Sequence, residues 1–215
     1  MTRWKDSTGA VMAERRRTSR TKVEHEFRLI VIGCSLGGMH ALTTILGELP
    51  PTFPVPIAVV QHRYRTSNEG LPAYFRRHLH LKVVDADDKE WIRPGHVYLA
   101  PANYHLLVEE GEFSLSVDEA VAYSRPSVDV LFESAADAYH EAVVGVILTG
   151  ANSDGARGVA RIKENGGFVI VQDPNTAEAP AMPQAAIAST TVDRILPLDR
   201  IGPLLVELCF RPPAQ

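Results

Sequence analysis

The chain has 215 residues, a hydrophobic fraction of 45% and a formal net charge of −4. This length suits one domain that buries its own core, and the weak charge gives no overall attraction to nucleic acid or to an anionic membrane. The two cysteines, Cys34 and Cys209, are far apart, so no disulfide framework is expected. Without an apolar run of about 18 residues or a signal-peptide core, we expect a cytoplasmic protein with no membrane insertion.

The chain divides into a tail, a domain and a short C-terminal extension. Residues 1–26 are polar and carry three consecutive arginines, Arg15 to Arg17, which predicts a disordered tail. The alternative for this tail is a basic patch that docks an acidic partner. Residues 27–210 carry the hydrophobic periodicity of a domain, and residues 211–215 form a C-terminal tail.

Buried strands alternate with amphipathic helices at the start of the domain. Continuous apolar runs predict parallel strands at residues 28–33, 55–62 and 81–86. Apolar residues at helical spacing predict helices at residues 39–49 and near 71–79. This alternation is typical of βαβ units with right-handed crossovers.

The middle of the chain has a different pattern. Three short strand-like runs lie at residues 96–101, 104–110 and 113–118, separated by turn residues. Gly111 lies between the last two runs, which therefore predict a hairpin. We expect all three to be antiparallel strands attached to the edge of the sheet.

Parallel character returns in the second half. Ser127 is expected to cap a helix that carries Asp129 in its first turn. The pattern predicts helices at 127–140, 153–164, 182–189 and 199–208, and strands at 141–150, 167–173 and 194–198. The fold class predicted is α/β, with a doubly wound, mostly parallel sheet flanked by helices (Rossmann-like) and an antiparallel hairpin at the edge.

A serine follows the first predicted strand, in the sequence Gly33-Cys34-Ser35-Leu36-Gly37-Gly38. It fits G-x-S-x-G, the strand-to-helix turn that exposes a nucleophilic serine above a sheet. Sites in open α/β sheets lie at the carboxyl ends of the strands, which is where this turn falls. Ser35 is therefore the candidate nucleophile. Candidate oxyanion donors are the backbone N–H groups of Leu36, Gly37 and Gly38, or of the turn at Gly150.

Two further strand ends carry the partners that such a serine needs. His62 follows the second strand and is the candidate general base, although an ordinary surface histidine would also fit. Asp154 follows the strand at 141–150 and is the candidate that orients the imidazole. The alternative is that Asn152, Ser153 or Asp154 only caps the next helix. The order serine, histidine, aspartate also disfavours the α/β-hydrolase fold, which runs serine, acid, histidine.

Other chemistries fit the sequence less well. Ser35 replaces the second glycine of a dinucleotide-binding fingerprint, and no P-loop lysine motif occurs. Cys34 is interpreted as a small buried packing residue rather than a nucleophile. The eight histidines are scattered, without partners at metal-ligand spacing, so neither a metal nor a cofactor is expected.

Several motifs in the same order resemble the catalytic domain of the CheB-type chemotaxis receptor methylesterases. The matching segments are IGCSLGG (32–38), VVQHR (59–63), RPGHVYLAP (93–101), RPSVDVLFESAA (125–136), GVILTGANSDGARG (145–158) and MPQAAI (182–187). The resemblance implies hydrolysis of glutamate methyl esters on methyl-accepting chemoreceptors and deamidation of receptor glutamines. It also places the catalytic serine, histidine and aspartate at Ser35, His62 and Asp154.

The chain departs from the family pattern at three places. Leu36 stands where the family usually has threonine, and Ala151 stands where a methionine-like residue is common. Many members of the family carry an N-terminal receiver domain, whereas about 26 tail residues precede the first predicted strand here. We therefore expect either that this route of regulation does not operate or that a separate regulatory chain supplies the control. These departures leave two alternatives: an inactive binding or scaffold module, and a hydrolase of another small ester or amide.

Overall fold

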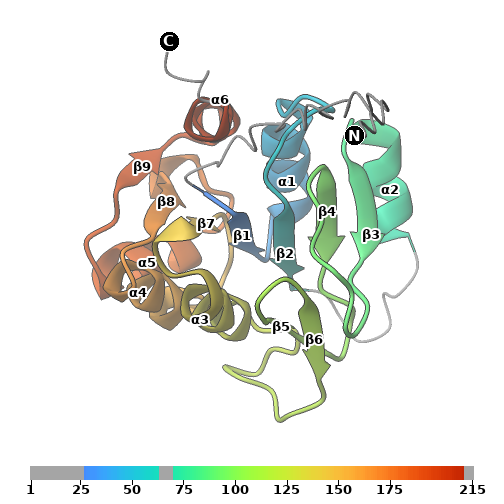
Figure 1. Ribbon diagram of the computed structural model, residues 1–215. Coiled ribbons are helices and arrows are strands. Elements are labelled where there is room, and N and C mark those ends of the chain that lie inside the picture. Colours follow the sequence, from blue (N-terminus) through green and yellow to red (C-terminus); the bar gives the residue numbers. More distant parts are fainter. Residues whose placement is uncertain (1–26, 63–69, 211–215) are drawn as a thin grey trace, which may run out of the picture.

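A seven-stranded parallel sheet forms the centre of the molecule (Figure 1). The computed structural model describes residues 27–62 and 70–210; the predicted tails at 1–26 and 211–215 lie outside these ranges. The strand order is β3-β4-β2-β1-β7-β8-β9. The strands are β1 (Leu29–Cys34), β2 (Ile57–Gln61), β3 (Lys82–Asp85), β4 (His96–Leu99), β7 (Val143–Ile147), β8 (Phe168–Gln172) and β9 (Arg194–Leu196).

Helices cover both faces of the sheet, as the alternating buried residues of the strands require. Along β1, Ile30 and Ile32 join one core cluster, whereas Leu29 and Val31 join the other. The first cluster includes residues of α1 (Gly38–Gly47), α2 (Leu71–His78) and α6 (Leu198–Cys209). The second includes residues of α3 (Val128–Tyr139), α4 (Ala156–Glu164) and α5 (Ala181–Ser189). The predicted doubly wound fold is confirmed.

The strand predicted at residues 96–101 is present, but the antiparallel direction predicted for it was wrong. Residues 96–99 form β4, which pairs in parallel with β2 and β3 inside the main sheet. A run of four residues shows the same apolar pattern in either direction, so the sequence did not reveal the partner strands. The other two runs do form a hairpin of β5 (His105–Val108) and β6 (Phe113–Ser116). This hairpin is a separate two-stranded sheet that lies beside α3 (Figure 1).

The order of the strands reverses at β1. From β1 the chain builds β2, β4 and β3 on one side, and later returns to place β7 on the other side. Such a switch point opens a crevice outside the carboxyl ends of the strands, where ligands of open α/β sheets bind. Ser35, His62 and Asp154 follow β1, β2 and β7, the three strands nearest this crevice. Within the described ranges, no helix is both long and apolar enough to cross a bilayer.

Candidate active site

The turn that carries Ser35 is tied to the neighbouring strand. The Ser35 N–H donates to the carbonyl of Thr149 at 2.9 Å, and the Thr149 hydroxyl donates to the carbonyl of Leu36 at 2.8 Å. Gly37 has φ of 79°, in the left-handed region where a side chain would add strain. The strand-to-helix turn predicted from G-x-S-x-G is therefore present, with its geometry set by contacts to the end of β7.

Gln61 links the backbones of the serine and the histidine. Its side-chain Nε2 donates to the carbonyl of Ser35 at 2.8 Å and to that of His62 at 3.0 Å. The Gln61 side chain occupies the space beside Gly38, where an added Cβ would lie 2.0 Å from Oε1. This role of Gln61 is not evident from the sequence, because a glutamine at a strand end belongs to no catalytic motif.

His62 and Asp154 form a direct pair. The Nε2 atom of His62 lies 2.8 Å from Oδ2 of Asp154, and the aspartate side chain is completely buried. The structure thus brings together the imidazole and the carboxylate that were expected from separate strands. Because an ionised carboxylate only accepts hydrogen bonds, Nε2 carries the proton in this pair.

The Asp154 carboxylate also lies at the N-terminus of α3. Oδ2 accepts a hydrogen bond from the N–H of Val128 at 2.8 Å. Oδ1 accepts from the N–H of Asp129 at 2.9 Å and from the Ser127 hydroxyl at 2.8 Å. Free N–H groups at a helix start favour negative charge. Ser127 caps α3 as predicted, accepting from the N–H of Val130, but its contact with Asp154 was missed.

These contacts keep Asp154 ionised. Burial has the largest single influence and works to raise the pKa of this carboxyl. The hydrogen bond from His62 and those from the N–H groups of Asp129 and Val128 together outweigh burial and hold the pKa below its usual value. The interpretation of Asp154 as a cap of the following helix was wrong. Gly155 is the N-cap of α4 and makes no side-chain capping bond, nor do Asn152 and Ser153 cap that helix.

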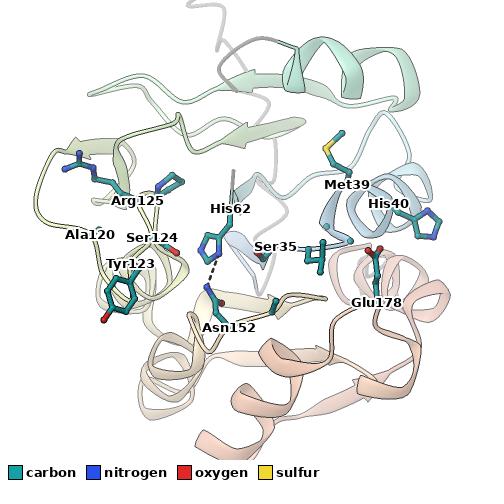
Figure 2. Close-up of a pocket in the computed structure, with 15 residues that line it drawn as sticks. Ser35, Met39, His40, His62, Ala120, Tyr123, Ser124, Arg125, Asn152 and Glu178 are labelled. Carbon is teal, nitrogen blue, oxygen red and sulfur yellow. Dashed lines mark hydrogen bonds between the residues drawn. The ribbon is translucent and has the colours of Figure 1, made fainter. Parts of the chain in front are cut away.

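Asn152 is a second partner of the imidazole (Figure 2). Its Nδ2 lies 3.3 Å from Nδ1 of His62, and its Oδ1 accepts from the N–H of Asp154 at 3.2 Å. From the sequence, Asn152 is expected only as an alternative helix cap. Asparagine side chains often accept a hydrogen bond from the backbone N–H two residues later, in an Asx turn. This local tendency is the signal in the sequence that could have identified Asn152. Within the described chain, no hydrogen bond joins Ser35 to His62.

The four expected oxyanion donors differ in their availability. The N–H of Gly38 donates to the carbonyl of Ser35, and the N–H of Gly150 donates to the carbonyl of Ala179, both at 2.9 Å. These two groups are engaged, so the expectation for them is corrected. The N–H groups of Leu36 and Gly37 have no hydrogen-bond partner among the residues that the structure describes. They precede α1 and remain the candidates.

An open pocket of about 1060 Å³ contains Ser35, His62 and Asn152. In Figure 2 these three lie between two walls, one with Tyr123 and Arg125 and the other with Met39, His40 and Glu178. Leu36 and Ala151, the two departures from the family pattern, both line it. Its walls carry both an arginine, Arg125, and a glutamate, Glu178.

Cys34 does not face this pocket. It is completely buried, and its Sγ lies 3.0 Å from Oε1 of Gln61. Burial raises the pKa of the thiol far above its usual range, which suppresses the thiolate that a nucleophilic cysteine needs. The interpretation of Cys34 as a packing residue is confirmed. Among the described residues, no cluster of three histidine, cysteine or acidic side chains is arranged to hold a metal ion.

A doubly wound parallel sheet with a serine, a histidine and a buried aspartate at neighbouring strand ends is typical of serine hydrolases. Comparison with known proteins narrows this class. The family model for CheB methylesterase matches residues 30–205. The chain belongs to this family.

Relatives support the assignment over most of the chain. A putative protein-glutamate methylesterase/protein-glutamine glutaminase of Leptospira interrogans (strain Fiocruz L1-130) is 49% identical over 183 residues, which cover 85% of this chain and 95% of that relative. The protein-glutamate methylesterase FrzG of Myxococcus xanthus is 39% identical over 84% of this chain, which spans 54% of FrzG. The crystal structure of the Thermotoga maritima CheB methylesterase catalytic domain superposes with a TM-score of 0.81 at 36% identity, covering 85% of this chain and 98% of that one.

Proposed function

We propose that this protein is a serine hydrolase that removes methyl esters from glutamate side chains of chemoreceptors and deamidates receptor glutamines. Ser35 is the nucleophile, His62 the general base and acid, and Asp154 the residue that orients the imidazole. The observation that carries the proposal is the 2.8 Å pair of His62 with the buried Asp154, in the pocket that Ser35 lines. Family membership supplies the class of substrate.

In the proposed mechanism, each reacting group has a defined role. Asp154 holds the proton of His62 Nε2, so Nδ1 is the nitrogen that removes the Ser35 proton as Oγ attacks the γ-carbonyl carbon. The N–H groups of Leu36 and Gly37 stabilise the negative oxygen of the tetrahedral intermediate. Collapse of that intermediate breaks the ester bond, and methanol leaves with the proton from Nδ1.

The second half of the reaction reverses these roles. His62 removes a proton from water, the hydroxide attacks the acyl carbon, and Ser35 leaves with the proton that Nδ1 returns. The products are a glutamate side chain and free enzyme. With a glutamine substrate, ammonia leaves in place of methanol.

Ser35→Ala tests the proposal directly. We expect turnover of a methylated chemoreceptor, followed by mass spectrometry, to fall by ~10⁴ or more, as in other catalytic triads. Ser153→Ala is the matched control, since this serine is exposed and lies three positions before the first residue of α4. Unchanged ester hydrolysis by folded Ser35→Ala protein would exclude Ser35 as the nucleophile.

A labelling experiment separates an enzyme from an inactive scaffold. A fluorophosphonate probe should modify the wild-type protein at one site, and the label should map to Ser35. His62→Gln should retain its fold and lose most of the labelling rate, because the base is gone. Absence of labelling in the folded wild-type protein would favour a binding module.

The site of action and the partners follow from the same proposal. We place the protein in the cytoplasm, where the signalling ends of chemoreceptors lie, and expect a separate regulatory chain to control it. Co-purification from cells that express a tagged form would identify such a chain. Recovery of only the tagged protein together with its substrate would argue against it.

A further inference from the structure

Two hydrogen bonds fix the orientation of the Asn152 amide: its oxygen accepts one of them, and its nitrogen donates the other. Its oxygen accepts from the N–H of Asp154 at 3.2 Å, which leaves the NH₂ group toward the imidazole. That group lies 3.3 Å from Nδ1 of His62. An NH₂ group can only donate, so Nδ1 must be the unprotonated nitrogen. The contact with Asp154 on the other side of the ring indicates the same tautomer, because the carboxylate only accepts and therefore requires a proton on Nε2.

Nδ1 is also the nitrogen that must accept the proton of Ser35. An imidazole nitrogen has one lone pair in the plane of the ring. Asn152 and Ser35 therefore compete for it, and in this structure Asn152 holds it. A donor on the lone pair stabilises the neutral ring and disfavours the imidazolium.

We propose that Asn152 is a positioning residue that holds His62 in the tautomer with its proton on Nε2, toward Asp154, and that releases Nδ1 when substrate brings Ser35 into reach. Once Nδ1 has taken the serine proton, the same NH₂ group faces a protonated nitrogen. That contact is unfavourable, so it promotes transfer of the proton onward to the leaving group. This inference rests on the proposed function.

The charged and titratable groups around His62 come from several elements. Asp154 pairs with it from the loop after β7. Among the described residues that line the pocket, Arg125 and Tyr123 lie on the segment before α3, Glu178 precedes α5, and His40 lies on α1. Substitutions at Asn152 leave all of these in place, so a change in His62 titration between variants reports on Asn152.

Asn152→Asp is the decisive variant. The new side chain has the same shape and keeps an oxygen for the Asp154 N–H, but its second oxygen accepts rather than donates. The contact with Nδ1 therefore changes from one that favours an unprotonated nitrogen to one that favours a protonated nitrogen. A carboxylate at this distance should raise the His62 titration midpoint by roughly one to three pH units. Asn152→Ala, which removes both the donor and the oxygen that accepts from the Asp154 N–H, should raise it by less, and Ser153→Ala should not move it.

Nitrogen NMR of protein labelled at histidine measures this without any substrate. The His62 signals are those that disappear in His62→Gln. In the wild type we expect a protonated Nε2 and an unprotonated Nδ1 at neutral pH. In Asn152→Asp we expect both nitrogens protonated at the same pH, with kcat/KM reduced about tenfold or more and recovered as the pH is raised.

Two outcomes would overturn the inference. One is a wild-type His62 whose proton is on Nδ1. The other is a His62 titration in Asn152→Asp that matches those of the wild type and of Ser153→Ala. Both are read from the resting protein. They are therefore separate from the failure of Ser35→Ala to lose activity, which would refute the proposed function alone.

Discussion

The Asp154 carboxylate accepts hydrogen bonds from backbone N–H groups around Asp129, and the Asp129 carboxylate accepts from backbone N–H groups that follow Asp154. Asp154 accepts from Val128 and Asp129 at the start of α3, whereas Oδ1 of Asp129 accepts from Gly155 and Gly158 at the start of α4, both at 2.9 Å. Each carboxylate thus binds the start of the helix next to the other aspartate, and we call this the exchanged-carboxylate arrangement. Asp154, which pairs with His62, is part of this structural unit, so the two helix starts fix its position.

Asp154→Asn should lower stability as well as activity. The amide cannot accept as strongly from Val128, Asp129 and Ser127, and we expect a loss of about 2 to 4 kcal/mol in the free energy of unfolding near neutral pH. Urea denaturation measures this loss. A variant that is as stable as the wild type would show that the carboxylate contributes little beyond its shape.

The same carboxylate predicts how stability depends on pH. Its pKa in the folded protein is below the value of about 3.9 in an unfolded chain. Its contribution is therefore complete well above that unfolded value and is lost as the pH falls through the folded pKa. Urea midpoints measured from neutral pH to about pH 3 should converge for the wild type and Asp154→Asn. Parallel curves over this range would contradict the prediction.

Asp129→Ala should weaken the start of α4 and indirectly disturb Asp154. Its carboxylate is almost fully buried and accepts from Gly155 and Gly158. We expect a loss of about 2 kcal/mol in the free energy of unfolding, together with reduced kcat. Asp137→Ala is the control, since Asp137 lies on the exposed face of α3, the helix that also carries Asp129. It should leave the free energy of unfolding and kcat almost unchanged. Equal effects of the two substitutions would contradict the exchanged-carboxylate arrangement.

Gly150→Ala should displace Ser35, the proposed nucleophile. A Cβ at this position would lie 1.9 Å from Sδ of Met182 and 3.0 Å from Cβ of Ser35. We expect a cost of about 1 to 3 kcal/mol in stability and a fall in the rate of fluorophosphonate labelling. Gly47→Ala is the matched control, since nothing lies within 4 Å of its added methyl group. There the substitution should stabilise α1 by up to about 1 kcal/mol without altering the labelling.

The two cysteines should be unreactive in the native protein. Both are buried, and burial raises the pKa of the Cys209 thiol to about 12 and that of Cys34 further still. A chromogenic disulfide reagent should detect neither thiol before unfolding and both afterwards. Rapid reaction of Cys34 in the folded state would reopen its interpretation as a nucleophile.

The sequence was most informative about strand ends. Buried parallel strands are continuous apolar runs, so the residues that follow them stand out, and Ser35, His62 and Asp154 were found in this way. The same pattern could not place β4, because its neighbours depend on hydrogen bonds between distant segments. Direction is a property of a pair of strands rather than of one run.

The supporting contacts of the site were the part that the sequence did not reveal. Gln61 reaches Ser35 across 26 positions, and Ser127 reaches Asp154 across 27. Neither residue type is unusual at its position, so only the folded chain shows the contact. Asn152 is different, because its hydrogen bond to the N–H of Asp154 is local and could be anticipated from turn chemistry.

The junction of β1 with β7 divides the site into contributions from two segments of the chain. Ser35 and His62 follow strands on one side of that junction, and Asp154 and Asn152 follow a strand on the other. If the sheet opened along this line, Ser35 and His62 would part from Asp154 and Asn152. Catalytic competence is therefore a sensitive reporter of one strand pairing, and during refolding it should return only when that pairing closes.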